Sequence, residues 1–108
     1  MTGAVREVLT HRASRAQQRL WFVEQLVPGE PVNNISFEFT YPARVDAAAL
    51  RAATADVVAR HEALRTMFRV RDNVLWRVVL TPPDQPPVEF VDLSGLPAGE
   101  REPACRAL

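Results

Sequence analysis

Apolar side chains recur at three- and four-residue intervals in two parts of the chain, which predicts two amphipathic helices. The first begins at Ser14 and stops at the Pro-Gly pair of 28–29. Ser14 and Gln17, three residues apart, form a capping-box pattern that satisfies free backbone N–H groups at a helix start. The second begins after Asp46, a favourable N-cap, and extends to about His61.

Apolar residues alternate strictly with polar ones at 35–41, which predicts a half-buried strand, and three further segments also have the composition of strands. Asp72 and Asn73 separate two of them and tolerate the left-handed backbone of a tight hairpin, so we expect these two strands to be antiparallel. The proline-rich stretch that follows them favours an extended surface connection. The predicted strands are 35–41, 66–71, 74–80 and 88–91.

The remaining segments complete an α/β pattern. Residues 1–13 are expected to be a poorly ordered lead-in, with a short strand near 5–9 as an option. From Leu96 a third helix runs to the end of the chain, which indicates a cut within a longer protein. This order predicts one α/β domain over 14–108, with helices mainly on one face of a mixed or largely antiparallel sheet.

The composition argues against several classes of function. The 108 residues hold thirteen acidic and thirteen basic side chains, which argues against a nucleic-acid binder. No apolar run is long enough to span a membrane, and no signal-peptide core is visible, so a cytoplasmic location is expected. A lone Cys105 and two scattered histidines predict neither an internal disulfide nor a metal site.

The stretch RHEALRTMF concentrates charge beside apolar residues where a helix is predicted to meet a strand. His61 next to Glu62 could serve as a general base. The alternative, which we favour, is that His61 is a hydrogen-bonded residue of the junction.

The two arginines of this stretch need partners, because an unpaired buried charge is costly. Glu62 can pair with Arg60 or Arg65. The other arginine requires an acid from elsewhere, which is either Glu38 or Asp92 of this chain or a residue outside it.

Two stretches resemble motifs of the condensation domains of nonribosomal peptide synthetases. SRAQQRLWFV, residues 14–23, is similar to the first family motif, SxAQxR(L/M)(W/Y)xL, with Val23 in place of the usual leucine. RHEALRTMF, residues 60–68, matches the second, RHExLRTxF, at every fixed position. The resemblance covers about residues 10–108 but only the N-terminal part of such a domain.

The resemblance implies a chloramphenicol-acetyltransferase-like lobe and an enzyme that joins donor acyl and acceptor aminoacyl thioesters into an amide. Such enzymes act in the biosynthesis of peptide antibiotics and other secondary metabolites. Both thioesters are carried on the phosphopantetheine of partner peptidyl or aminoacyl carrier proteins, and no cofactor is bound directly. The family's catalytic histidine belongs to a third motif, HHxxxDG, which does not occur in these 108 residues. The chain is therefore expected to end before that motif and to be inactive alone.

The resemblance also implies roles for individual residues. An arginine of the second motif, Arg65 in preference to Arg60, is expected to pair with the aspartate of HHxxxDG. The stretch AQQRLW is more similar to the sequences of relatives that accept an L-configured donor than to those of relatives that accept a D-configured donor. The expected supports of the active site are Arg65, Arg60, His61 and Glu62, and the expected tunnel-lining or first-motif positions are Gln17, Arg19 and Trp21.

Two alternatives remain open. The chain could be a non-catalytic half-lobe that docks a carrier protein or completes another polypeptide. It could also be part of another acyltransferase with an HxxxD motif. The sequence that follows Leu108 distinguishes these interpretations.

Overall fold

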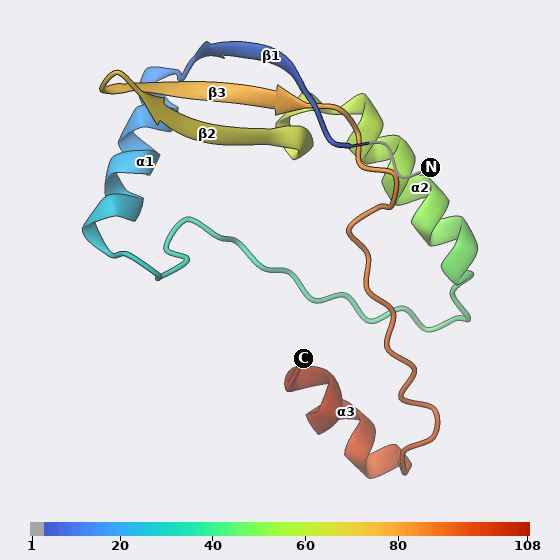
Figure 1. Ribbon diagram of the computed structural model, residues 1–108. Coiled ribbons are helices and arrows are strands. Elements are labelled where there is room, and N and C mark those ends of the chain that lie inside the picture. Colours follow the sequence, from blue (N-terminus) through green and yellow to red (C-terminus); the bar gives the residue numbers. More distant parts are fainter. Residues whose placement is uncertain (1–3) are drawn as a thin grey trace.

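A three-stranded antiparallel sheet lies at one end of the protein, and a helix extends from the region of each end of its strands (Figure 1). The computed structural model describes residues 4–108. Its sheet has the strand order β1-β3-β2. The strands are β1 (Glu7–Arg12), β2 (Thr66–Arg71) and β3 (Val74–Leu80), and the helices are α1 (Arg15–Leu26), α2 (Ala47–Arg60), the 3-10 turn η1 (Glu62–Arg65) and α3 (Ala98–Arg106).

Both long helices begin where their capping residues predict. The Ser14 hydroxyl accepts from the Gln17 N–H at 3.1 Å, and the Gln17 side chain accepts from the Ser14 N–H at 2.8 Å. Asp46 accepts from the Ala49 N–H at 3.0 Å, which caps α2 in the same way. These bonds satisfy N–H groups that the first turn of a helix leaves free.

The predicted hairpin is confirmed. β2 and β3 pair antiparallel from Thr66 opposite Val79 to the tight turn at Asp72 and Asn73. These two residues have φ of 52° and 58°, the left-handed backbone that a two-residue turn between twisted strands requires.

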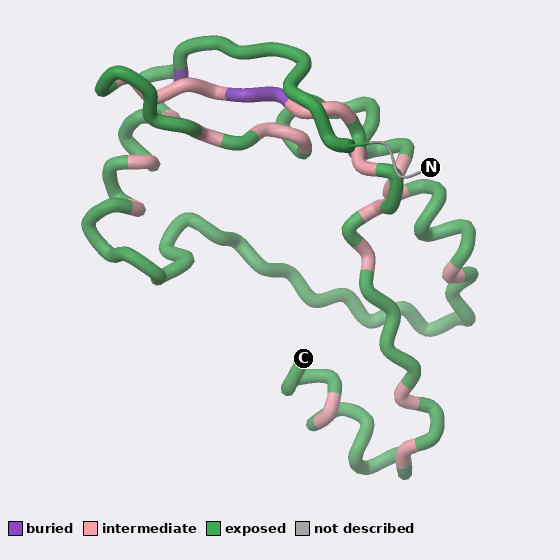
Figure 2. The backbone as a smooth tube through the Cα atoms, viewed as in Figure 1, coloured by how far each residue is buried: buried purple, intermediate pink, exposed green. Residues whose placement is uncertain are grey.

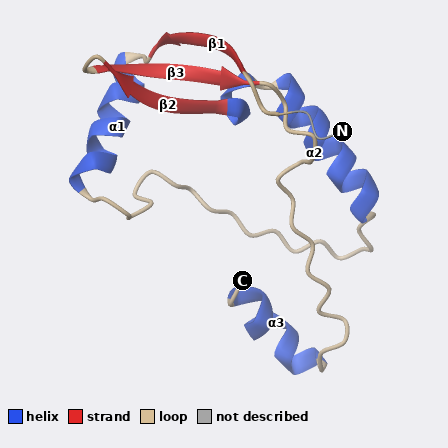
Figure 3. Ribbon diagram, in the orientation of Figure 1, coloured by secondary structure: helices blue, strands red, loops and turns tan. Residues whose placement is uncertain are grey.

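The N-terminal strand lies later than the 5–9 expected for it, and the segment predicted to be a lead-in takes part in the sheet. β1 spans Glu7–Arg12 and pairs antiparallel with β3 (Figure 3). Charged residues interrupt the apolar alternation of this segment, because β1 is an edge strand whose side chains are all exposed. The register shifts between Glu7 and Leu9, and the irregularity further obscures the pattern.

Two predicted strands do not form in the described residues. Residues 35–41 belong to no helix or strand, no neighbouring strand pairs with them, and their apolar side chains face solvent. The Phe37 and Phe39 rings stack on each other at 6.2 Å between centroids instead of packing into a core. Residues 88–91 are likewise irregular, and Phe90 lies under the Arg51 guanidinium at 4.6 Å. Apolar alternation favours a strand, but a partner is needed to make one.

The buried core is small and lies in the sheet (Figure 2). Val78 and Val79 of the central strand are each 1% exposed, and Ala13 and Val58 are the other buried apolar residues among those described. The accessible surface is 9442 Å², whereas a compact protein of this mass exposes about 6,000 Å². The radius of gyration is 18.0 Å, against about 13 Å for a compact chain. Long connections and α3 therefore extend away from the sheet (Figure 1).

The turn between β2 and β3 supports a direct test. Replacing Asn73 by valine places a β-branched residue in a left-handed backbone, and we expect a loss of about 1–2 kcal/mol in the free energy of unfolding. Asn73→Gly is the matched control and should leave stability unchanged or raise it, because glycine adopts positive φ without steric cost. Urea denaturation of the protein measures both, and equal stability of the valine and glycine variants would contradict the assigned turn.

Candidate functional site

The charged stretch at 60–68 builds the junction between α2 and β2. The His61 N–H donates to the Val57 carbonyl at 3.1 Å and ends the helix, and η1 then turns the chain. The Thr66 hydroxyl donates to the Glu62 carbonyl at 2.8 Å and links the turn to the first residue of β2. His61 thus contributes its backbone to the junction, and its side chain is exposed.

Arg65 binds three backbone carbonyls from two different elements. Its Nε donates to the Val58 carbonyl at 3.0 Å and its Nη2 to the Ala59 carbonyl at 3.2 Å, both near the C-terminal end of α2. Its Nη1 donates to the Leu80 carbonyl at the end of β3, at 2.5 Å. The half-buried guanidinium therefore connects the last turn of α2 to the last residue of the central strand.

No carboxylate pairs with this guanidinium within residues 4–108. Glu62 forms an ion pair with neither Arg60 nor Arg65, contrary to the expectation from their spacing. Glu38 lies in the exposed 35–41 segment. Within the described residues the partners of this guanidinium are therefore backbone carbonyls and not Glu38 or Glu62.

Asp92, the other acid considered for Arg65, is engaged locally. Its carboxylate accepts from the Ser94 N–H at 2.9 Å. Hydrogen bonds from the Ser94 side chain and then from its backbone, together with nearby Arg101, hold the pKa of Asp92 below its ordinary value of 3.8. Arg101 donates to the carbonyls of Ser94 and Leu96, so these residues form a small cap before α3.

An aromatic contact joins the two sequence motifs. Trp21 of α1 and Phe68 of β2 lie with ring centroids 6.4 Å apart and planes tilted by 47°. This geometry is favourable for two aromatic rings. It seats the first-motif helix against the strand that follows the second motif.

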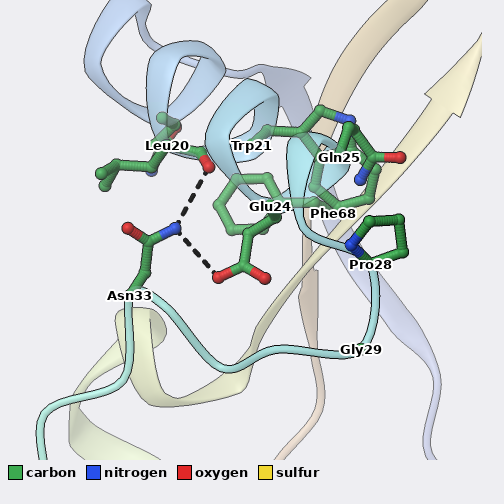
Figure 4. Close-up of a pocket in the computed structure, with 9 residues that line it drawn as sticks. Leu20, Trp21, Glu24, Gln25, Pro28, Gly29, Asn33 and Phe68 are labelled. Carbon is green, nitrogen blue, oxygen red and sulfur yellow. Dashed lines mark hydrogen bonds between the residues drawn. The ribbon is translucent and has the colours of Figure 1, made fainter.

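Beside this contact lies an open cavity of about 580 Å³ between α1, the loop that follows it and β2 (Figure 4). The Asn33 side chain donates to the Leu20 carbonyl at 3.1 Å and to the Glu24 carboxylate at 2.9 Å, which holds the loop against the helix. Among the described residues, no histidine, cysteine, serine or threonine lines the cavity, and Glu24 is its one ionisable lining residue. Its lining residues are Gln17, Leu20, Trp21, Glu24, Gln25, Pro28, Gly29, Asn33 and Phe68.

The structure separates the predicted site residues into groups. Gln17 and Trp21 line this cavity, whereas Arg19 lies on a shallow groove elsewhere on α1. Arg65 sits at the junction of α2 and β3. The side chain of Arg60 is exposed and makes no hydrogen bond or ion pair with residues 4–108.

Asn33 and Glu24 organise the cavity but were not predicted as site residues. The asparagine follows a Pro-Gly turn, a position where asparagine is common for its backbone preferences alone. Its side-chain partners lie nine and thirteen residues earlier. No local pattern specifies such contacts.

A sequence profile of the family described as Condensation domain matches residues 10–107. This range includes both motifs and nearly all of the described chain. The chain belongs to the condensation domain family.

Relatives of this condensation-domain chain include large synthetases. It is 37% identical over 95 residues to one of the linear gramicidin synthase proteins of Brevibacillus parabrevis, covering 88% of this chain and 2% of the relative. It is 39% identical over 95 residues to the phosphinothricin tripeptide synthetase PhsC of Streptomyces viridochromogenes, covering 88% of this chain and 9% of the relative.

A third relative is the isonitrile lipopeptide synthase of Mycobacterium tuberculosis, 46% identical over 67 residues, with 62% of this chain and 3% of the relative covered. The chain thus spans less than a tenth of the length of these curated relatives. No solved structure matches it significantly. Within residues 4–108, none of the helices has both the length and the apolar character needed to cross a bilayer.

Several residues of the second family motif have structural roles in this condensation-domain chain. Three of its fixed positions make internal contacts: Arg65 binds carbonyls, Thr66 closes the 3-10 turn, and Phe68 meets Trp21. The side chains of the first three fixed positions, residues 60–62, are exposed. The motif is therefore both a structural junction and a surface.

The aromatic contact predicts a measurable coupling. In the complete condensation domain, a double-mutant cycle of Trp21→Ala and Phe68→Ala should give a coupling of about 0.5–1.5 kcal/mol in the free energy of unfolding. Phe22→Ala is the matched control, because Phe22 is 62% exposed on the same helix and should show no coupling to Phe68. Strict additivity of the Trp21 and Phe68 changes in urea denaturation would contradict the contact.

Asp92 should titrate below its ordinary pKa of 3.8 when followed by NMR of its carboxyl carbon. A depressed carboxyl pKa favours the folded state above the unfolded value, and that contribution disappears as the pH falls through the folded value. Ser94→Ala removes the largest cause and should raise the titration midpoint. An unchanged midpoint in this variant, with Arg101 intact, would exclude the Ser94 side chain as the main cause.

Proposed function

We propose that the protein that contains this chain forms amide bonds between two thioesters carried on the phosphopantetheine arms of carrier proteins, in the cytoplasm. The family match over residues 10–107, with both motifs meeting at the Trp21–Phe68 contact, is the observation that supports this most directly. Relatives named as synthetases of peptides and lipopeptides agree with it.

In this reaction the amino group of the acceptor attacks the carbonyl carbon of the donor thioester. A C–N bond forms and the C–S bond breaks. The donor carrier's phosphopantetheine leaves as a thiol and takes up the proton that the amine loses. A base near the amine assists this proton transfer. In the condensation domain family the HHxxxDG motif lies at that position.

This chain contributes scaffold to that reaction. It contains two histidines, His11 in β1 and His61 at the end of α2. Both are exposed, and neither lies among the residues that line the cavity beside Trp21. We infer that the 108 residues alone do not catalyse condensation. They act together with the remainder of the domain and with carrier proteins.

The residues of the junction between α2 and β2 would support the active site without taking part in its chemistry. In this proposal Arg65 faces the aspartate of the HHxxxDG loop, while Arg60, His61 and Glu62 form the exposed side of the same turn. Gln17 and Trp21 would border the substrate tunnel through the cavity that they line. Arg19, on the groove with Phe22 and Val23, would contact other parts of the domain.

A non-catalytic role is the second candidate. Large apolar side chains of residues 35–41 are 68–87% exposed, and Phe22 and Leu26 of α1 are 62% and 64% exposed. Surfaces of this kind mark interaction sites. A half-lobe that completes another polypeptide, without chemistry of its own, would use them directly.

One assay separates the two candidates. The isolated chain and the full-length protein are each mixed with donor- and acceptor-loaded carrier proteins, and amide product is followed by mass spectrometry. We expect product only with the full-length protein, and we expect His61→Ala to retain amide formation, because this exposed residue supports the active site without supplying its base. His11→Ala is the matched control.

Turnover by the isolated chain that His61→Ala abolishes would overturn the assignment of catalysis to another part of the domain. Absence of product with the full-length protein, combined with tight carrier binding, would favour the non-catalytic candidate.

A further inference from the structure

We propose that Arg65 is a positioning residue that fixes the point where the chain leaves β3, and that it does so through backbone carbonyls rather than through an ion pair alone. Its three side-chain nitrogens each donate to a different carbonyl, those of Val58, Ala59 and Leu80. One residue thereby joins the end of a helix to the end of the central strand.

The end of α2 needs these donors. The last four carbonyls of a helix have no intrahelical partner. In α2 the His61 N–H serves the Val57 carbonyl, and Arg65 serves the next two, Val58 and Ala59. A positive charge at this position also interacts favourably with the negative end of the helix dipole.

The planar shape of guanidinium is what makes the arrangement possible. Arginine presents five N–H donors in a rigid fork, and three carbonyls at the ends of two elements here occupy three of its nitrogens. The ammonium group of lysine carries the same charge but is a compact centre with rotatable donors. Lysine therefore preserves the charge at this position without reproducing the geometry.

The strand exit, the point where the chain leaves β3, is also fixed by a second pair of hydrogen bonds. The Thr81 N–H donates to the Arg6 carbonyl at 2.8 Å, and the Arg6 N–H donates to the Thr81 hydroxyl at 3.0 Å. The Leu80 carbonyl on one side and the Thr81 N–H on the other are thus both occupied. The direction in which the chain continues beyond β3 depends on Arg65 and on the residue before β1.

This role is compatible with the ion pair in the proposed function, on which the catalytic part of the inference rests. Three donors are used, and two N–H groups of the guanidinium remain. Because the carbonyls fix the plane of the group, they also fix the direction of these two donors. A carboxylate bound by these two donors would therefore be held at a fixed position relative to α2 and β3.

The test uses the full-length protein with Arg65→Lys and Arg65→Ala, followed by hydrogen exchange and by steady-state amide formation. We expect both variants to speed exchange at the Leu64 and Thr81 amides on the order of tenfold to a hundredfold, the loss associated with one or two hydrogen bonds to a charged group. Lysine should behave like alanine, with kcat lowered and the KM for each carrier protein unchanged. Millimolar ethylguanidinium, but not ethylammonium, should restore kcat in Arg65→Ala.

Arg71→Ala is the matched control. Arg71 is the last residue of β2 and pairs only with Asp72 at the surface among the described residues, so its loss should leave the Leu64 and Thr81 amides unchanged. Wild-type exchange and turnover in Arg65→Lys would overturn the proposal, since charge alone would then suffice. If the wild-type protein makes no amide, the proposed function fails, while the exchange data still decide whether Arg65 holds the strand exit.

Discussion

A helix end inside a folded protein leaves carbonyl groups that require donors, and this requirement shapes the centre of the chain. Arg65 meets it for Val58 and Ala59 and extends the same guanidinium to Leu80. The 3-10 turn between α2 and β2 has the length that brings the side chain back under the helix. Helix, turn and strand are therefore one unit, and the end of β3 is joined to α2 through a single side chain.

The second organising contact is aromatic. Trp21 and Phe68 belong to different motifs, separated by a long connection, yet they meet between α1 and β2. The cavity beside them is closed on one side by Asn33, which ties the following loop to α1. Motif residues thus fall into those that hold the scaffold and those, such as Arg60 and Arg19, that face outward.

Elements were predicted correctly where interactions between residues close in the sequence are sufficient to form them. Ser14 and Asp46 mark helix starts through short-range bonds, and Asp72 with Asn73 marks the turn by backbone preference. The 35–41 segment has equally clear alternation but no strand beside it, because pairing depends on distant residues. Arg65 shows the same limit within the site. Its charge indicates that it needs acceptors, but it does not indicate whether a carboxylate or three carbonyls supply them.

The order of strands in the sheet has a consequence for synthesis. The central strand is the last of the three along the chain, so β1 leaves the ribosome well before the strand that it pairs with. At about 5–20 residues per second, β1 and the Trp21 face of α1 wait for seconds without their partners. The β2–β3 hairpin is local and closes quickly once made. The earlier segment then docks onto the hairpin, so β1 and the Trp21 face of α1 remain unpaired until β3 has been made.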